Sequence, residues 1–373
     1  MQLLKELRIW KLRIPFRVSF RHASATRTST ESIWVEAVDS DGLVGYGESC
    51  PRSYVTGENL NSCMSFFAKH RVGLCRQVRC LEDLREWTAN HRSEIDQSPA
   101  AWCAIELAVL DLLARRMSSS LEELLGLPKL DGTFCYTAVI GDQSESAFAK
   151  QLKRYREVGF EQFKVKLSGK PAQDAAKFGI LSSDGILAKD VRVDANNLWK
   201  SPRDATSYLS PMAESFFAIE EPLVAGDFQG MRELAETLGK LVILDESFCR
   251  ADQFAQIKSD YHRWLINLRV SKMGGLLRSL EVAQFACENN IGLVIGAQVG
   301  ETSLLTRAAL TVAQVARPVL KGQEGAFGKL LLEADVIESP LTFGARGRLS
   351  VLSNPAIQSP VEVVRPKAFL EQF

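Results

Sequence analysis

Five charged side chains stand at comparable points in the sequence, each within or at the end of a short apolar run. The bases are Lys164 and Lys166 in FKVKL, and the acids are Asp194 in VRVDAN, Glu220 in FFAIEEP and Asp245 in LVILDES. Residues two apart on a strand point to one side, so the two ammonium groups should lie together. Three converging carboxylates offer the oxygen-only ligand set of a hard divalent cation, magnesium first and manganese second.

These residue types suit removal of a proton from the carbon next to a carboxylate. Loss of that proton leaves two negative charges on one carboxylate framework, and a cation on the oxygens offsets the second charge as it develops. The base must be neutral near pH 7, although a free lysine titrates near about 10.4. A second ammonium group and a metal ion close by both favour the neutral amine.

Simpler explanations exist for each residue taken alone. An acid that follows a strand can cap the next helix, and a Lys-x-Lys pair can lie on a solvated strand edge. Three acids and two lysines at the same end of successive strands are harder to explain in this way. The pattern therefore favours an active site.

The spacing of these residues predicts the fold that positions them. From Lys166 to Asp194, Glu220, Asp245 and Arg269 the intervals are 28, 26, 25 and 24 residues. Strand followed by helix at a period near 25 residues is typical of a (β/α) barrel, in which the carboxyl ends of the strands carry the active site. We expect an α/β protein with a TIM-type barrel of seven or eight units over residues 131–345.

The flanking segments have a different pattern. Residues 1–130 combine alternating, β-rich stretches with the helical stretch AAWCAIELAVLDLLARR, which predicts an α+β capping domain. We expect it to cover the barrel mouth, with the Arg21–Ser32 segment as part of the lid. The tail, residues 346–373, is again β-like and is expected to return to the capping domain.

Composition excludes several classes of protein. Lys+Arg and Asp+Glu both number 45, so no basic excess indicates nucleic acid or an anionic membrane. The first residues mix charges into their apolar stretch, unlike a secretory signal. Eight cysteines without a CxxC pair indicate reduced thiols and a cytoplasmic protein. The four histidines lack metal-ligand spacing.

The motifs KVK, VDAN, IEEP, LDES and SKMGGL, with GYGES, YVTGE, AIELAVLDLLA and EGAFGKLLL, resemble the muconate-lactonizing branch of the enolase superfamily over nearly the whole chain. That branch includes cycloisomerases, o-succinylbenzoate synthases and dipeptide epimerases. The resemblance implies that Asp194, Glu220 and Asp245 bind Mg2+, that Lys166 transfers the proton, and that Lys164 steadies the substrate carboxylate and the enediolate. We expect a small-molecule carboxylate substrate and a homo-oligomer.

The chain departs from the family on the sixth strand, where a second lysine is usual and Arg269 stands. Bringing the pKa of an arginine from above 12 to about 7 would cost roughly 7 kcal/mol, so a guanidinium suits charge stabilisation better than proton transfer. Alternatively, Arg269 only pairs with one of the acids. Lys272, an odd number of positions further on, is expected to point to the other side.

The remaining site predictions concern substrate contacts. Dipeptide epimerases carry an Asp-x-Asp at the eighth strand end for the substrate's amino group, whereas KGQEGAFG offers one acid. The predicted contacts are Asn196, Glu301, Glu324, Arg27, Arg52 and Tyr54. Glu301 could instead cap a helix, and Arg27 or Arg52 could be a solvated surface charge.

Three functions remain open at this point. The first is a one-base cycloisomerase or syn-elimination enzyme acting on a carboxylate. The second is an epimerase of dipeptides or N-acyl amino acids, which YVTGE supports and Arg269 opposes. The third is an inactive homologue that binds a carboxylate, against which the intact acids and lysines argue.

Overall fold

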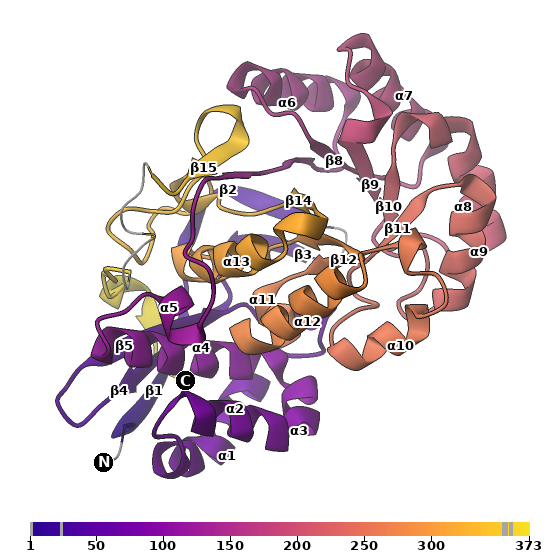
Figure 1. Ribbon diagram of the computed structural model, residues 1–373. Coiled ribbons are helices and arrows are strands. Elements are labelled where there is room, and N and C mark those ends of the chain that lie inside the picture. Colours follow the sequence, from indigo (N-terminus) through magenta and orange to yellow (C-terminus); the bar gives the residue numbers. More distant parts are fainter. Residues whose placement is uncertain (1–2, 23–24, 353–356, 358–360) are drawn as a thin grey trace.

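The computed structural model describes residues 3–22, 25–352, 357 and 361–373. A large barrel carries its helices on the outside, and the N-terminal elements α1–α4, β1, β4 and β5 form a second body beside it (Figure 1). The predicted lid segment, Arg21–Ser32, lies only partly within this description, because residues 23–24 fall outside it.

The barrel is an eight-stranded sheet in which each strand pairs in parallel with the next along the chain. Thr137 donates its backbone N–H to the Gln323 carbonyl at 2.7 Å, which joins the first and last strands. This confirms the predicted TIM-type barrel. The strands are β7 (Ala138–Ile140), β8 (Phe163–Lys166), β9 (Val191–Asp194), β10 (Ala218–Glu220), β11 (Leu241–Leu244), β12 (Trp264–Leu268), β13 (Gly292–Ile295) and β14 (Leu320–Gln323).

Helices between the strands form the outer layer of the barrel (Figure 1). Their starts follow local sequence signals: Ser144, Ser201 and Asp227 accept backbone N–H groups at three helix N-termini. The helices are α6 (Glu145–Val158), α7 (Pro171–Ser183), α8 (Pro202–Leu209), α9 (Phe228–Leu238), α10 (Phe254–Ile257), α11 (Val270–Met273), α12 (Leu276–Glu288) and α13 (Ser303–Val315).

The N-terminal body combines an antiparallel sheet with helices. Its sheet has the order β16-β1-β4-β5, so the C-terminal strand pairs with the first strand of the chain. The strands are β1 (Glu6–Leu12), β4 (Ser32–Val38), β5 (Val44–Ser49) and β16 (Leu370–Glu371), with a separate hairpin of β2 (Pro15–His22) and β3 (Ala25–Ser29). The helices are α1 (Leu60–Gln77), α2 (Leu81–Asn90), α3 (Arg92–Gln97), α4 (Pro99–Arg116) and α5 (Leu121–Leu125).

Helix α4 is the buried centre of this body, and GYGES explains its close approach to the sheet. A Cβ atom added at Gly45 or Gly47 would collide with the α4 backbone near Leu112 or Ala104. The two glycines therefore let β5 lie directly on the helix. A further short pair, β6 (Thr133–Cys135) with β15 (Arg348–Ser350), joins the start of the barrel to the tail.

The N-terminal body sits at the carboxyl end of the barrel strands. Cys50 donates its N–H to Ser271 Oγ (2.9 Å) just after β12, and Arg52 donates to the Val299 carbonyl (2.6 Å) after β13. Glu48 accepts the Thr302 N–H at 3.1 Å, at the start of α13. These contacts hold the segment after β5 beside the strand ends. The boundaries at residues 130 and 345 remain predictions.

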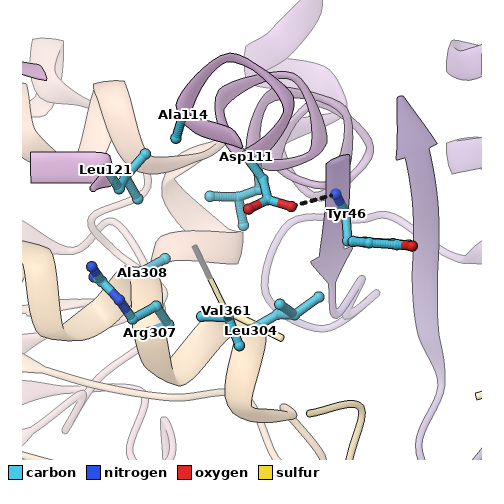
Figure 2. A pocket seen from close by; sticks show the side chains of 9 residues that line it. Tyr46, Asp111, Ala114, Leu121, Leu304, Arg307, Ala308 and Val361 are labelled. Atoms are coloured by element: carbon cyan, nitrogen blue, oxygen red, sulfur yellow. Dashed lines mark hydrogen bonds between the residues drawn. The ribbon is translucent and has the colours of Figure 1, made fainter. Parts of the chain in front are cut away.

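A cavity of about 50 Å³ lies where α4 and α5 meet α13 (Figure 2). Its lining is mainly apolar, and Asp111 accepts the Tyr46 N–H at 2.9 Å on one wall. Ligand sites for small molecules usually enclose roughly 300 Å³ or more. This cavity is too small for a substrate and lies away from the strand ends. Separately, no helix of the described chain is long and apolar enough to cross a membrane.

Glu106 links the two bodies, since it projects from α4 and accepts the N–H groups of Leu276 and Leu277 at the start of α12. Burial raises the pKa of Glu106 to about 8. A carboxyl group whose pKa is raised on folding contributes its full stability below about pH 4, the pKa of a free glutamate, and loses that contribution as pH rises from there to about 8.

We predict that Glu106→Ala lowers the free energy of unfolding by about 1–3 kcal/mol, because two buried N–H groups lose their acceptor. Glu106→Gln should match wild type near pH 4 and become progressively the more stable protein as pH rises to 8, since an amide cannot ionise. Denaturant titrations at both pH values measure this. Equal pH dependence in wild type and Glu106→Gln would contradict it.

Candidate active site

Adjacent barrel strands bring the predicted acids to one level. Asp194 pairs in register with Glu220 on one side and with Lys166 on the other, and Asp245 directly follows β11. All three carboxyl side chains are almost completely buried. The structure thus places the three acids at neighbouring strand ends, as the spacing predicted.

Lys164 lies among the acids. Its Nζ atom is 2.8 Å from Glu220 Oε1, 3.2 Å from Asp194 Oδ2 and 3.3 Å from a Glu324 oxygen. Burial by itself lowers the pKa of Lys164, but the charges of these carboxylates raise it above its ordinary value. Lys164 is therefore a fixed ammonium group, suited to holding a negative charge.

Lys166 is more exposed than Lys164, at 12% against 3% of the side chain. Its Nζ atom donates to Asn196 Oδ1 at 2.9 Å and lies 3.4 Å from Asp194 Oδ2. Asn196 adopts a positive φ of 46°, which turns the chain immediately after β9. Asn196, predicted as a substrate contact, thus contacts the predicted base, and its role toward substrate remains a prediction.

Two cationic side chains meet at Asp245. Arg269 Nη2 contacts Asp245 Oδ2, and Arg269 Nη1 donates to Gln298 Oε1 at 3.0 Å. Lys272 Nζ donates to Asp245 Oδ1 at 2.9 Å and also to the Asp245 carbonyl at 2.7 Å. Lys272 reaches Asp245 from the short helix α11, where strand alternation no longer applies, and it contacts a different carboxylate oxygen from Arg269; that it points to the other side from Arg269 remains a prediction.

The donor set fits a hard divalent cation by its chemistry. Glu220 Oε2 is buried with no hydrogen-bond partner, and Asn267 donates to the other Glu220 oxygen at 2.9 Å. Within the described chain no three His, Cys, Asp or Glu side chains form a ready-made metal cage. Lys164 and Arg269 lie against these carboxylates, so an ion would compete with them for the oxygens.

Glu324 lies at the eighth strand end, on the Lys164 side of the barrel. Arg192 Nη2 donates to its Oε1 atom at 2.6 Å, and Lys164 donates to its Oε2 atom at 3.4 Å. Burial would raise the pKa of Glu324, but the charges of Lys164 and Arg192 lower it to about 2. Glu324 is therefore an ionised carboxylate with cations on both oxygens.

The other predicted contacts lie in the loops after β13 and β5 and on strand β3. Glu301 is half-buried and accepts the Gln298 N–H at 2.6 Å; loss of solvent around the carboxyl group raises its pKa to about 7. Arg52 donates to the carbonyls of Pro51 and Val299, which ties the loops together. Arg27 stacks over Tyr54 with 5.6 Å to the ring centroid. Their roles toward substrate remain predictions.

Sequence reasoning missed several buried polar residues around the site. Lys177, on α7, donates to the Lys166 carbonyl at 2.8 Å and to Asp174 at 2.8 Å. Asp174 in turn accepts the Ser168 N–H at 3.0 Å. A lysine inside an amphipathic helix carries no signal that its ammonium group turns inward. Arg192, two residues before Asp194 on the same strand, could have been found from strand alternation.

A barrel whose strand ends carry three acids, a Lys-x-Lys pair and a cation on the opposite strand defines a class of enzyme that acts on carboxylate substrates. Comparison with known proteins gives the family. Residues 5–126 match the mandelate racemase / muconate lactonizing enzyme N-terminal domain, and residues 147–355 match the enolase C-terminal domain-like family.

Characterised relatives and solved structures agree with this match. The chain is 28% identical over 350 residues to the L-Lys-D/L-Arg epimerase of Methylococcus capsulatus, covering 92% of this chain and 94% of the relative. It is 24% identical over 332 residues to the o-succinylbenzoate synthase of Bacillus subtilis, covering 86% and 84%.

Among solved structures, an enolase superfamily member from Listeria innocua has a TM-score of 0.85 at 21% identity, covering 100% of this chain and 98% of that one. The Enterococcus faecalis dipeptide epimerase complexed with Mg and L-Leu-L-Tyr has a TM-score of 0.79 at 23% identity, covering 93% and 97%.

The chain belongs to the enolase superfamily, in its mandelate racemase and muconate-lactonizing branch. It is an enzyme of the isomerase or lyase type, whose chemistry is metal-dependent removal of the proton next to a carboxylate. The expected superfamily, fold and class of reaction are confirmed.

The contacts of Lys177 generate a prediction about Lys166. Lys177→Met removes the donor to the Lys166 carbonyl and leaves Asp142 and Asp174 without their cation. We expect substrate α-proton exchange to slow about tenfold, with little change in KM, because the base is displaced while the substrate contacts remain. The pH of half-maximal exchange should also rise, since the added negative charge favours the ammonium form of the base.

The matched control is Arg232→Met, which breaks the Arg232–Asp260 pair (2.8 Å) on another barrel helix. Unfolding measured on both variants separates loss of stability from loss of positioning. A Lys177→Met enzyme with the wild-type pH profile would show that Lys177 only stabilises the fold.

Proposed function

We propose that this enzyme carries out one-base proton transfer on a small carboxylate, as a cycloisomerase or a syn-elimination enzyme. One observation carries the proposal: the two cations that flank the substrate position differ in kind. Lys166 ends β8, and Arg269 follows β12, four strands further around an eight-stranded barrel. One side therefore holds an amine that can titrate, and the opposite side holds a guanidinium.

Lys166 takes the α-proton and returns it, or delivers it to a leaving group, on its own side of the substrate. The Asn196 amide oxygen accepts a hydrogen bond from Lys166 and so fixes the direction of the Nζ atom. Lys164, held as an ammonium among carboxylates, steadies the substrate carboxylate and the charge that develops on it.

Arg269 stabilises negative charge on the opposite side and does not exchange protons. A guanidinium stays charged at any pH at which the enzyme folds. Its hydrogen bond to Gln298 fixes one edge of the group in the site.

Asp194, Glu220 and Asp245 would hold Mg2+, with Mn2+ as a substitute, and the ion would supply positive charge to the substrate carboxylate as negative charge develops. The buried, unpartnered Glu220 Oε2 atom supports this assignment. The complex of the Enterococcus faecalis dipeptide epimerase with Mg supports the choice of metal.

The second candidate is epimerisation of a dipeptide or N-acyl amino acid. The curated relatives that are epimerases or racemases favour it, and Arg269 opposes it, because inversion needs proton transfer on both sides. An inactive carboxylate-binding homologue is the third candidate, opposed by the intact Lys164, Lys166 and acids.

The proposal also includes the cellular compartment, the oligomeric state and the domain boundaries. All eight cysteines are free thiols in the structure, which fits a reducing compartment such as the cytoplasm. A homo-oligomer, a 1–130 capping domain, a 131–345 barrel and a 346–373 returning segment remain predictions. The pairing of β16 with β1 supports the last of these.

The stereochemistry of proton exchange tests the proposal. Substrate incubated with enzyme in deuterated water should gain deuterium at the α-carbon with retention, as followed by NMR on a chiral carboxylate. Lys166→Ala should reduce this exchange by at least about a hundredfold, as expected for loss of a general base. Deuterium in both stereoisomers at comparable rates would contradict one-base transfer.

Arg269→Lys provides the matched variant, because it keeps the positive charge and restores a group that can titrate. We expect it to produce weak epimerisation that the wild type lacks. If neither enzyme inverts the substrate while both exchange with retention, the residue opposite Lys166 does not decide the stereochemical outcome.

A further inference from the structure

Both oxygens of Glu324, the acid at the eighth strand end, contact cations. Glu324 Oε1 is 2.6 Å from Arg192 Nη2 and 3.3 Å from Lys164 Nζ, and Oε2 accepts from Lys164 at 3.4 Å. The Arg192 side chain is 1% exposed. When Lys164 turns to a substrate carboxylate, Arg192 still neutralises Glu324.

The sequence makes room for Arg192 at this place. Gly322, two residues before Glu324, lies on β14 opposite Arg192, and a Cβ atom added there would lie 2.5 Å from Arg192 Nη1. The same Arg192 Nη1 atom donates to Thr137 Oγ1 at 3.1 Å. The guanidinium thus lies where a side chain at position 322 would begin.

This arrangement determines the charge that a substrate meets there. Positions 322 and 324 lie on the same side of the strand, and an acid at each would give two negative charges. Here Gly322 contributes none, and the charge of Glu324 is cancelled by Arg192. Glu301, the other predicted acid at the mouth, accepts the Gln298 N–H and feels the positive charges of Arg269 and Arg52.

We propose that the Arg192–Glu324 pair selects carboxylate substrates that carry no free ammonium group on this side of the site. The substrate class is an N-acylated amino acid or an amine-free carboxylic acid. A free ammonium would lose its water and meet a carboxylate whose charge Arg192 already neutralises, which costs free energy. This inference rests on the proposed proton-transfer function and adds the substrate class.

The direct test compares α-proton exchange in deuterated water for matched pairs of carboxylates. Each pair is a dipeptide, such as L-Ala-L-Leu or L-Ala-L-Glu, and its N-acetyl or N-succinyl derivative. Wild-type enzyme should exchange the acylated member at least about tenfold faster, the ratio that one charge-assisted hydrogen bond contributes. Faster exchange of the free dipeptides would overturn the inference.

A pair of variants tests the cause. Arg192→Val with Gly322→Asp removes the guanidinium and builds a second acid beside Glu324, so the preference should shift toward free dipeptides by about tenfold or more. Arg192→Val alone removes the guanidinium without building a second acid and should produce a smaller shift. An unchanged preference in a folded double variant would show that Arg192 and Gly322 do not set specificity.

A variant with balanced charges guards against loss of folding. Arg192→Met with Glu324→Gln removes both charges together and leaves no buried ion unpaired, so it should keep the wild-type discrimination against the ammonium group. If it gains activity on free dipeptides, the inference is wrong. Absence of exchange with every carboxylate tested would instead contradict the proposed function itself.

Discussion

The structure depends on charge neutralisation inside the barrel mouth. Ionised groups are costly to bury unless each has partners, and here carboxylates and cations from several strands share one small volume. Lys164 touches three carboxylates, and Asp245 is contacted by both Arg269 and Lys272. The charges in this cluster are therefore balanced by partners from neighbouring strands, and a change at one strand end alters the balance at the next.

The rest of the fold serves to hold that cluster in register. Parallel pairing places Lys166, Asp194 and Glu220 at one level, and the turn after β8 is tied to α7 through Asp174 and Lys177. The N-terminal body contributes buried carboxylates, Glu48 and Glu106, that accept N–H groups at the starts of α13 and α12. Contacts far from the chemistry thus fix the loops that surround it.

The sequence predicted those features of the fold that depend on local periodicity. The period near 25 residues indicated the barrel, and the position of each acid at a strand end followed from it. Strand alternation gives no prediction where the chain leaves the strand: Lys272 contacts Asp245 from a short helix that begins after Arg269. It also missed long-range partners, since the spacing of Arg192 and Glu324 along the chain says nothing of their contact. The side-chain direction of Lys177 is likewise set by tertiary packing.

Calorimetric titration of chelated protein with Mg2+ tests whether Asp194, Glu220 and Asp245 jointly hold one divalent cation. We expect one bound ion per chain for the wild type and for a surface control, Asp252→Asn, whose carboxylate is 69% exposed. Asp245→Asn should abolish measurable binding, because it removes one of the three negative charges that the ion needs. Wild-type affinity and stoichiometry in Asp245→Asn would show that these three acids do not hold the ion.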